Sequence, residues 1–109
     1  MNYLQELNKS MELLYQNGYY FIGQNVLYGG ASMFHTIKDI PEDKRIELPV
    51  FEATQAGLAT GMALDGMKIC SIYPRMDFLI LAINQIVNHL DKAEEMSDGQ
   101  FKPKVIIRT

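Results

Sequence analysis

Four short segments rich in β-branched and aromatic residues alternate along the chain with longer segments that carry helical patterns. Strands are predicted at Tyr19–Gly23, Arg45–Leu48, Lys68–Tyr73 and Lys104–Arg108. Helices are predicted from Asn2 to Asn17, from Phe51 to Leu64 and from Asp77 to Met96, with a short one over Ala31–Ile37. Such alternation indicates an α/β fold with a mainly parallel sheet. Parallel strands need crossovers that cover both faces, so a three-layer α/β/α arrangement is expected.

The third predicted helix differs from the others in its first two turns. Residues 78–83 are apolar almost all round, as expected of a helix start that is buried on several sides. The first helix has the weak start signal of Asn2 followed three residues later by Gln5.

Length and charge exclude several classes of protein. The 109 residues form one domain at most, and a net charge of −3 offers no basic surface for nucleic acid. The single cysteine, Cys70, excludes an internal disulfide and any multi-thiolate zinc site, and its place in a strand favours a buried, inert thiol. No signal peptide or membrane-spanning run is visible, so a cytoplasmic protein is expected.

The stretch from Leu48 to Gly61 places one carboxylate, Glu52, where an extended segment turns into a helix. Glu52 has two interpretations. It could be a first-turn carboxylate that the helix dipole favours, or a partly buried acid that shares a proton with a ligand nitrogen. Gly57 and Gly61 follow on the same helix, where each costs about 0.5–1 kcal/mol relative to alanine. Close approach of another backbone or a ligand would explain that cost.

Ligands of open α/β sheets bind beyond the carboxyl ends of the strands. The segments expected there are Gln24–Gly30, Pro49–Glu52 and Pro74–Phe78. Phe78 alone is more typical of a core residue than of a ligand platform, and Tyr28-Gly29-Gly30 lacks the third glycine of a dinucleotide fingerprint. Arg75 and Asp77 fit either a surface pair or a binding group.

No metal site or nucleophilic triad is visible in the sequence. His35 and His89 are isolated, and none of Ser32, Ser71 and Ser97 lies in a Gly-x-Ser-x-Gly setting.

Taken in order, the motifs resemble the pyrimidine-binding domain of thiamine-diphosphate enzymes of the transketolase-like group. The motifs are Phe21-Ile22-Gly23, Tyr28-Gly29-Gly30, Pro49 with Glu52-Ala53, Gly57 with Gly61, Met76-Asp77-Phe78, Asn84-Gln85, Met96-Ser97 with Gly99, and Val105-Ile106-Ile107-Arg108. The resemblance is closest to the beta subunit of the decarboxylating component of 2-oxo acid dehydrogenases. It covers nearly the whole chain and implies the fold of that domain.

The resemblance implies a role for particular residues. Glu52 matches the glutamate that hydrogen-bonds the aminopyrimidine ring of thiamine diphosphate and promotes its imino tautomer, which removes the proton from the reactive thiazolium carbon. Phe78 matches the aromatic residue that stacks on the pyrimidine ring. Tyr28, Gly29 and Gly30 match the loop near the cofactor edge. The helix from Met76 matches one that packs at the subunit interface, which implies an oligomer.

The sequence also departs from the family pattern. Gln24-Asn25 is neutral where an acidic pair is usual, Phe51 replaces a small hydroxyl residue, and Thr54-Gln55 replaces a glycine and an apolar residue. Phe51 and Arg75 are the residues that we expect to affect specificity.

The chain lacks the Gly-Asp-Gly motif, with its later asparagine, that holds magnesium and the diphosphate. Residues 1–109 are therefore expected to form a partial, apparently truncated pyrimidine-binding domain that is inactive alone. A diphosphate-binding alpha-type subunit or domain would be its partner, and Mg would bind only through that partner. The alternatives are a non-catalytic assembly or regulatory module that keeps the fold, and an unrelated flavodoxin-like binding domain.

Overall fold

A computed structural model describes all 109 residues and contains one four-stranded sheet. The strands are β1 (Tyr19–Gly23), β2 (Arg45–Glu47), β3 (Lys68–Ile72) and β4 (Val105–Arg108). Their order across the sheet is β2-β1-β3-β4, and every neighbouring pair is parallel. The predicted strands and the parallel sheet are confirmed, with boundaries that agree to within one residue.

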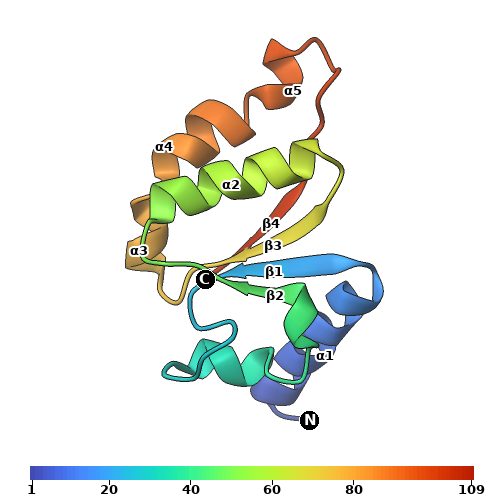
Figure 1. The fold of residues 1–109 in the computed structure, drawn as a ribbon, viewed down its shortest axis with the longest axis vertical. Coiled ribbons are helices and arrows are strands. Elements are labelled where there is room, and N and C mark those ends of the chain that lie inside the picture. Colours follow the sequence, from blue (N-terminus) through green and yellow to red (C-terminus); the bar gives the residue numbers. More distant parts are fainter.

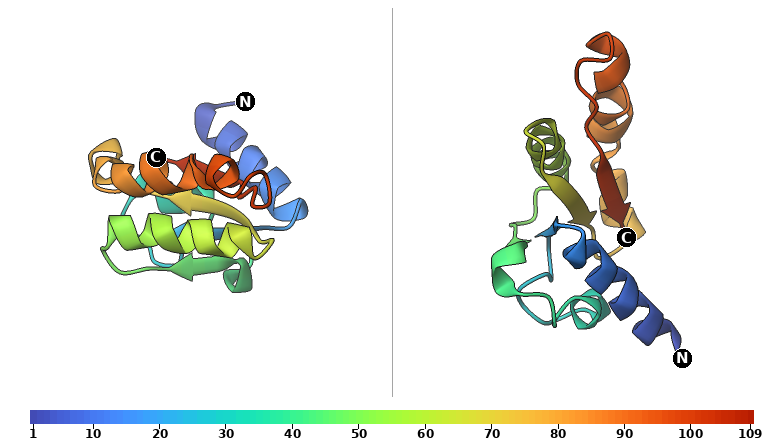
Figure 2. Two further views of the ribbon diagram at one scale, coloured as in Figure 1. Left: turned by 90° about the horizontal axis from the view of Figure 1, so that it is seen from above. Right: turned by 90° about the vertical axis from the view of Figure 1, so that its right-hand side faces the viewer.

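Helices cover both faces of this sheet, which confirms the three-layer arrangement (Figure 1). The helices are α1 (Tyr3–Gln16), α2 (Glu52–Leu64), α3 (Met76–Ile80), α4 (Ile83–Gln85) and α5 (Ala93–Met96), with 3₁₀ turns η1 (Ser32–Thr36) and η2 (Glu42–Lys44) and a π-helical turn η3 (Ile86–Leu90). Figure 2 shows α1 and α2 on opposite sides of the strands.

Alternation along the strands divides the core between the two faces. Phe21, Cys70 and Ile72 point toward α1 and η1, where Met11 and Met33 cover them. Ile22 and Ile69 point toward α2, where they pack on Ala59. Successive side chains of a strand lie on opposite faces, so both faces of a sheet buried in this way must be apolar. The thiol of Cys70 is buried as predicted, and burial raises its pKa to about 12.

The start of α1 shows how a local signal acts. The Asn2 side chain accepts a hydrogen bond from the Gln5 backbone N–H at 3.0 Å, and the Asn2 N–H donates to the Gln5 side chain at 2.9 Å. This capping box satisfies two backbone donors that the helix start leaves free, typically worth about 1 kcal/mol.

The prediction of one continuous helix from Asp77 to Met96 is wrong. The segment consists of several short helical pieces. Some backbone N–H groups bond the carbonyl three residues earlier instead of four, as Ala82 N–H does with Leu79. Asp91 N–H bonds the carbonyl of Ile86, five residues earlier, which is π-helical geometry. The β-branched residues Ile80, Ile83, Ile86 and Val87 lose side-chain freedom in a helix, so propensity does little to keep it regular.

The start of this segment is also less buried than the sequence indicates. Ala82 packs inward, with Leu79 and Ile86 beside it. Ile80, Leu81 and Ile83 face outward, and Leu81 is 63% exposed. The expected burial on several sides is therefore not provided by this chain, because only one side of α3 and α4 has an element to pack against.

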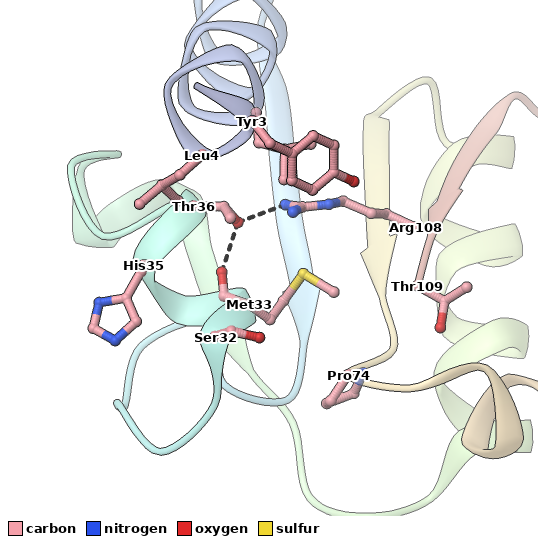
Figure 3. A pocket seen from close by; sticks show the side chains of 10 residues that line it. Tyr3, Leu4, Ser32, Met33, His35, Thr36, Pro74, Arg108 and Thr109 are labelled. Carbon is pink, nitrogen blue, oxygen red and sulfur yellow. Dashed lines mark hydrogen bonds between the residues drawn. The ribbon is translucent and has the colours of Figure 1, made fainter. Parts of the chain in front are cut away.

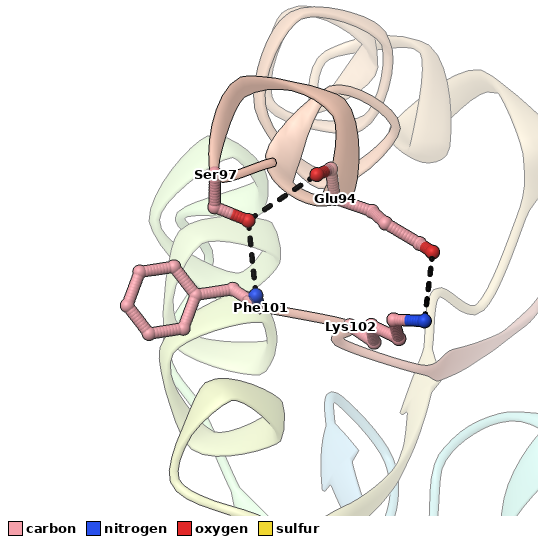
Figure 4. A network of polar contacts seen from close by, with 4 residues as sticks. All are labelled: Glu94, Ser97, Phe101 and Lys102. Carbon is pink, nitrogen blue, oxygen red and sulfur yellow. Dashed lines mark hydrogen bonds and ion pairs between the residues drawn. The ribbon is translucent and has the colours of Figure 1, made fainter. Parts of the chain in front are cut away.

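A small polar cluster joins α5 to the segment that leads into β4 (Figure 4). The Ser97 hydroxyl donates to the Glu94 carbonyl at 3.3 Å and accepts from the Phe101 backbone N–H at 2.9 Å, and the Lys102 ammonium lies 3.3 Å from the Glu94 carboxylate. The cluster directs the chain back toward the sheet.

The close packing expected at Gly57 and Gly61 is not made within this chain. Both glycines are exposed, and a Cβ added at either would meet nothing within 4 Å. The buried side of α2 instead carries Ala56, Ala59 and Ala63. The two glycines lie on the opposite side of the helix, so this chain provides no contact that requires them.

Replacement of Gly57 by alanine is therefore expected to stabilise the chain. The methyl group enters open space, and alanine loses less backbone entropy on folding, so the free energy of unfolding should rise by about 0.5–1 kcal/mol. Urea denaturation of the wild type and of G57A measures the difference. A loss of stability in G57A would show that a neighbour does approach this face.

Candidate functional site

Three connecting segments lie together at the carboxyl edge of the sheet. Because β1, β2 and β3 run parallel, residues 24–30, 48–51 and 73–75 all leave the sheet at the same edge (Figure 1). The Gln24 side-chain amide also lies within 3.5 Å of the Pro49 carbonyl, which links the first two segments. The sequence-predicted residues Tyr28, Glu52 and Phe78 lie on or directly after these segments.

Glu52 is the first residue of α2 and is 8% exposed. Its side chain makes no hydrogen bond or ion pair with another residue, although its backbone carbonyl lies 3.4 Å from the Tyr73 hydroxyl. The Glu52 carboxyl oxygens still reach solvent, because Arg45 Nε is the one buried side-chain polar atom without a hydrogen-bond partner. The arrangement fits both interpretations of Glu52 and leaves its carboxyl oxygens available to a ligand.

A buried polar network lies at the base of the first turn of α2. The Gln55 side-chain N–H₂ donates to the Ser71 hydroxyl at 3.1 Å and to the Ile72 carbonyl at 2.9 Å. Burial raises the pKa of the Tyr73 hydroxyl, a hydrogen bond with Ser71 opposes that rise, and the Glu52 charge adds to it. The network ties α2 to the end of β3, so it fixes the helix turn that carries Glu52.

The functional importance of Gln55 does not follow from its departure from the family pattern. A signal was present nonetheless. Gln55 lies one helical turn from Glu52 on the same side of α2 as Ala56 and Ala59, so it is a polar residue within an apolar stripe. Buried polar side chains are nearly always hydrogen-bonded, and such a residue predicts a partner on the facing strand.

Phe78 is half-buried in α3, and the Arg75 guanidinium lies over its ring, 4.5 Å from the ring centroid. Arg75 also pairs with Asp77 at 3.3 Å, and both side chains are largely exposed. This ion pair is therefore of the surface kind, worth about 0–1 kcal/mol. One face of Phe78 is covered by a cation, and a stacking ligand would use the other face or displace Arg75.

Tyr28, Gly29 and Gly30 form the exposed tip of the loop after β1, and Tyr28 is 68% exposed. Gly30 has a φ of +137°, which favours glycine at this position. No hydrogen bond joins the tip to Glu52 or Phe78. The structure thus brings the predicted residues to one edge but does not join them into an enclosed site.

A groove lies on the face of the sheet that α1 and η1 cover (Figure 3). It has a volume of about 570 Å³ and lies between α1, η1 and the end of β4. Arg108 reaches across it and donates to the Thr36 hydroxyl at 2.7 Å, and burial lowers the pKa of the Arg108 guanidinium. None of Glu52, Phe78 and Tyr28 lines this groove.

No group of three or more His, Cys, Asp or Glu side chains could hold a metal ion. No helix combines the length and the apolar character needed to cross a membrane.

The sequence is similar to beta subunits of 2-oxo acid dehydrogenases. It is 33% identical to the pyruvate dehydrogenase E1 component subunit beta-3, chloroplastic, of Oryza sativa subsp. japonica, over 84% of this chain and 22% of that protein. It is 32% identical to the pyruvate dehydrogenase E1 component subunit beta of Cyanidium caldarium, over 82% of this chain and 28% of that protein.

A third relative is the 2-oxoisovalerate dehydrogenase subunit beta of Bacillus subtilis (strain 168), 24% identical over 99% of this chain and 35% of that protein. No protein-family model matches the sequence. The chain spans between 22% and 35% of the length of these three relatives. The resemblance drawn from the ordered motifs is confirmed.

Proposed function

Because the chain is a sequence relative of the beta subunits of 2-oxo acid dehydrogenase E1 components, we propose that it is the pyrimidine-binding part of a thiamine-diphosphate enzyme. The observation that supports this function best is the carboxyl group of Glu52, which reaches solvent although the residue as a whole is largely buried. It has no partner within the chain and lies at the edge of the sheet where α/β proteins bind ligands. An aminopyrimidine ring nitrogen would supply the missing hydrogen bond.

Each site residue has a chemical role in this proposal. Glu52 exchanges a proton with the pyrimidine ring, and the network around Gln55 keeps its helix turn in place. Phe78 packs against one face of the ring, and the loop tip at Tyr28, Gly29 and Gly30 borders it. Thiamine diphosphate, when bound, supplies a thiazolium carbon that attacks the carbonyl of a 2-oxo acid. The protein's part is to position the cofactor and to polarise its pyrimidine ring.

The chain has no cluster of side chains for the magnesium ion, and its sequence lacks the Gly-Asp-Gly motif. We therefore assign these groups to a partner, an alpha-type subunit or domain that carries the Gly-Asp-Gly motif. The outward-facing side chains of Ile80, Leu81 and Ile83 are available for an interface with such a partner. The chain would then contribute one half of the site and be inactive alone.

Calorimetry on the assembled protein tests this function. Thiamine diphosphate with Mg²⁺ is titrated into the chain alone, into the partner alone and into their complex. Saturable binding is expected in the complex, with much weaker binding to either component. Equal binding by the partner with and without this chain would contradict the proposal.

The second candidate is a non-catalytic assembly or regulatory module that retains the fold. The guanidinium of Arg75 over the Phe78 ring favours it, because it occupies a face that a pyrimidine could stack on. The neutral Gln24-Asn25 pair favours it as well. The same titration separates the two functions, because a module of this kind forms the complex without adding to cofactor binding.

A further inference from the structure

The loop after β1 is held by side chains of the neighbouring strand β2. The Glu47 carboxylate accepts hydrogen bonds from three consecutive backbone N–H groups, those of Asn25, Val26 and Leu27, each at 3.0 Å. Asn25 donates to one carboxylate oxygen, and the other two N–H groups donate to the second oxygen. Successive N–H groups that converge on one anion form a nest, and Asn25 has the left-handed φ of +58° typical of such turns.

A second residue of β2 holds the same part of the loop from its carbonyl side. The Arg45 guanidinium donates to the Val26 carbonyl at 2.8 Å, and Arg45 is only 7% exposed. Residues 45 and 47 lie on the same face of the strand because side chains alternate. Val26 is thereby bonded through both its N–H and its C=O, while its side chain is fully buried in the core.

Of these two residues, Glu47 makes more hydrogen bonds to the loop. It accepts three hydrogen bonds from the loop backbone, whereas Arg45 donates one, and the charged side chain strengthens each of these bonds. The last anchored residue, Leu27, directly precedes the exposed tip of Tyr28, Gly29 and Gly30. In the other direction, the chain runs from Glu47 through only four residues to Glu52. One carboxylate therefore fixes the tip relative to the segment that carries Glu52.

We propose that Glu47 is a positioning residue that holds the loop tip, Tyr28 to Gly30, at the carboxyl edge beside Glu52. This role rests on the proposed function, because it affects cofactor binding only if the pyrimidine ring binds at that edge. Glu47 itself touches no cofactor. Its contribution is to keep the loop ordered before the cofactor arrives, which lowers the entropy lost on binding.

The first experiment measures loop order in the free chain. Amide hydrogen exchange, followed by NMR, compares the wild type with E47Q and with the matched control E42Q, in which an exposed glutamate of η2 is changed. A glutamine at position 47 loses the charge and turns its N–H₂ group toward one of the N–H donors. Protection of residues 25–27 is expected to fall about tenfold or more in E47Q and to stay unchanged in E42Q.

The second experiment measures cofactor binding in the complex with the diphosphate-binding partner. The Kd for thiamine diphosphate with Mg²⁺ is expected to rise about tenfold in E47Q, with turnover at saturating cofactor within twofold of wild type. A purely structural role would instead lower the amount of folded protein and leave the Kd of the folded fraction unchanged. If E47Q does not fold, E47D, which keeps the charge on a shorter side chain, is expected to give intermediate values for both measurements.

Unchanged exchange at residues 25–27 in E47Q would overturn the proposal. The proposal would also be overturned if E47Q lost the exchange protection of residues 25–27 but its complex bound thiamine diphosphate with the wild-type Kd. If the wild-type complex binds no cofactor, the proposed function fails, and the positioning role toward the cofactor fails with it. The exchange data on the free chain then show separately whether Glu47 orders the loop.

Discussion

Replacement of Glu52 by glutamine is expected to slow proton loss from the thiazolium carbon in the assembled enzyme by about 10²–10⁴-fold, the usual contribution of a positioned acid–base group. Glutamine has nearly the same size and still forms hydrogen bonds, but it cannot exchange a proton with the pyrimidine ring. The measurement is deuterium exchange at the thiazolium carbon in the complex, together with turnover of pyruvate and branched-chain 2-oxo acids.

The control for this variant is E6Q. Glu6 is also an acidic residue in the first turn of a helix, α1, but it is exposed and far from the carboxyl edge in sequence. E6Q should leave the exchange rate unchanged. Little stability should be lost in E52Q, because the Glu52 side chain makes no hydrogen bond that the change removes. Wild-type activity in E52Q would refute the assignment of Glu52 as the cofactor activator.

The sheet could be predicted from the sequence because its strands are short, apolar and separated by glycine and proline. Tyr19–Gly23 is bounded by Gly18 and by its own Gly23, and Lys68–Ile72 by Gly66 and Pro74. A parallel sheet buried on both faces requires such continuous apolar runs, so few other folds are compatible with this sequence pattern. The same reasoning places the candidate residues at one edge before any coordinates are known.

The irregular features could not be predicted, because each depends on contacts between segments far apart in sequence. Gly57 and Gly61 look like packing residues until α2 is seen to bury the alanines on its other side. The role of Glu47 depends on the parallel pairing of β2 with β1, which brings its carboxylate to N–H groups about twenty residues earlier. Under the proposed function, the groups that face Glu52 and Phe78 would come from the partner, so this sequence alone could not predict them.

Gly23, at the end of β1, lies where β1 and β3 leave no room for a side chain. Its φ is +142°, which side chains rarely adopt, and a Cβ at this position would overlap the backbone carbonyl of Ile72 on β3 and lie 3.0 Å from the Gln55 amide nitrogen. A backbone group in a parallel sheet cannot move aside without loss of strand pairing. G23A is therefore expected to lower the free energy of unfolding by at least about 3 kcal/mol, from overlap and backbone strain together.

The matched control for G23A is a glycine variant in which no overlap occurs. Gly18 also has a positive φ, +87°, but a Cβ there would meet nothing within 4 Å, so G18A measures backbone strain alone and should cost about 1 kcal/mol. The excess cost of G23A over G18A in urea denaturation then combines the overlap with the greater strain of alanine at φ +142° than at φ +87°. Because the overlap involves Ile72 and Gln55, which tie α2 to β3, G23A should also disturb the helix turn that carries Glu52. Equal costs for the two variants would show that β1 and β3 do not approach closely at this edge. The described contact of Gln55 with Ile72, which holds the helix turn of Glu52, would then be in doubt.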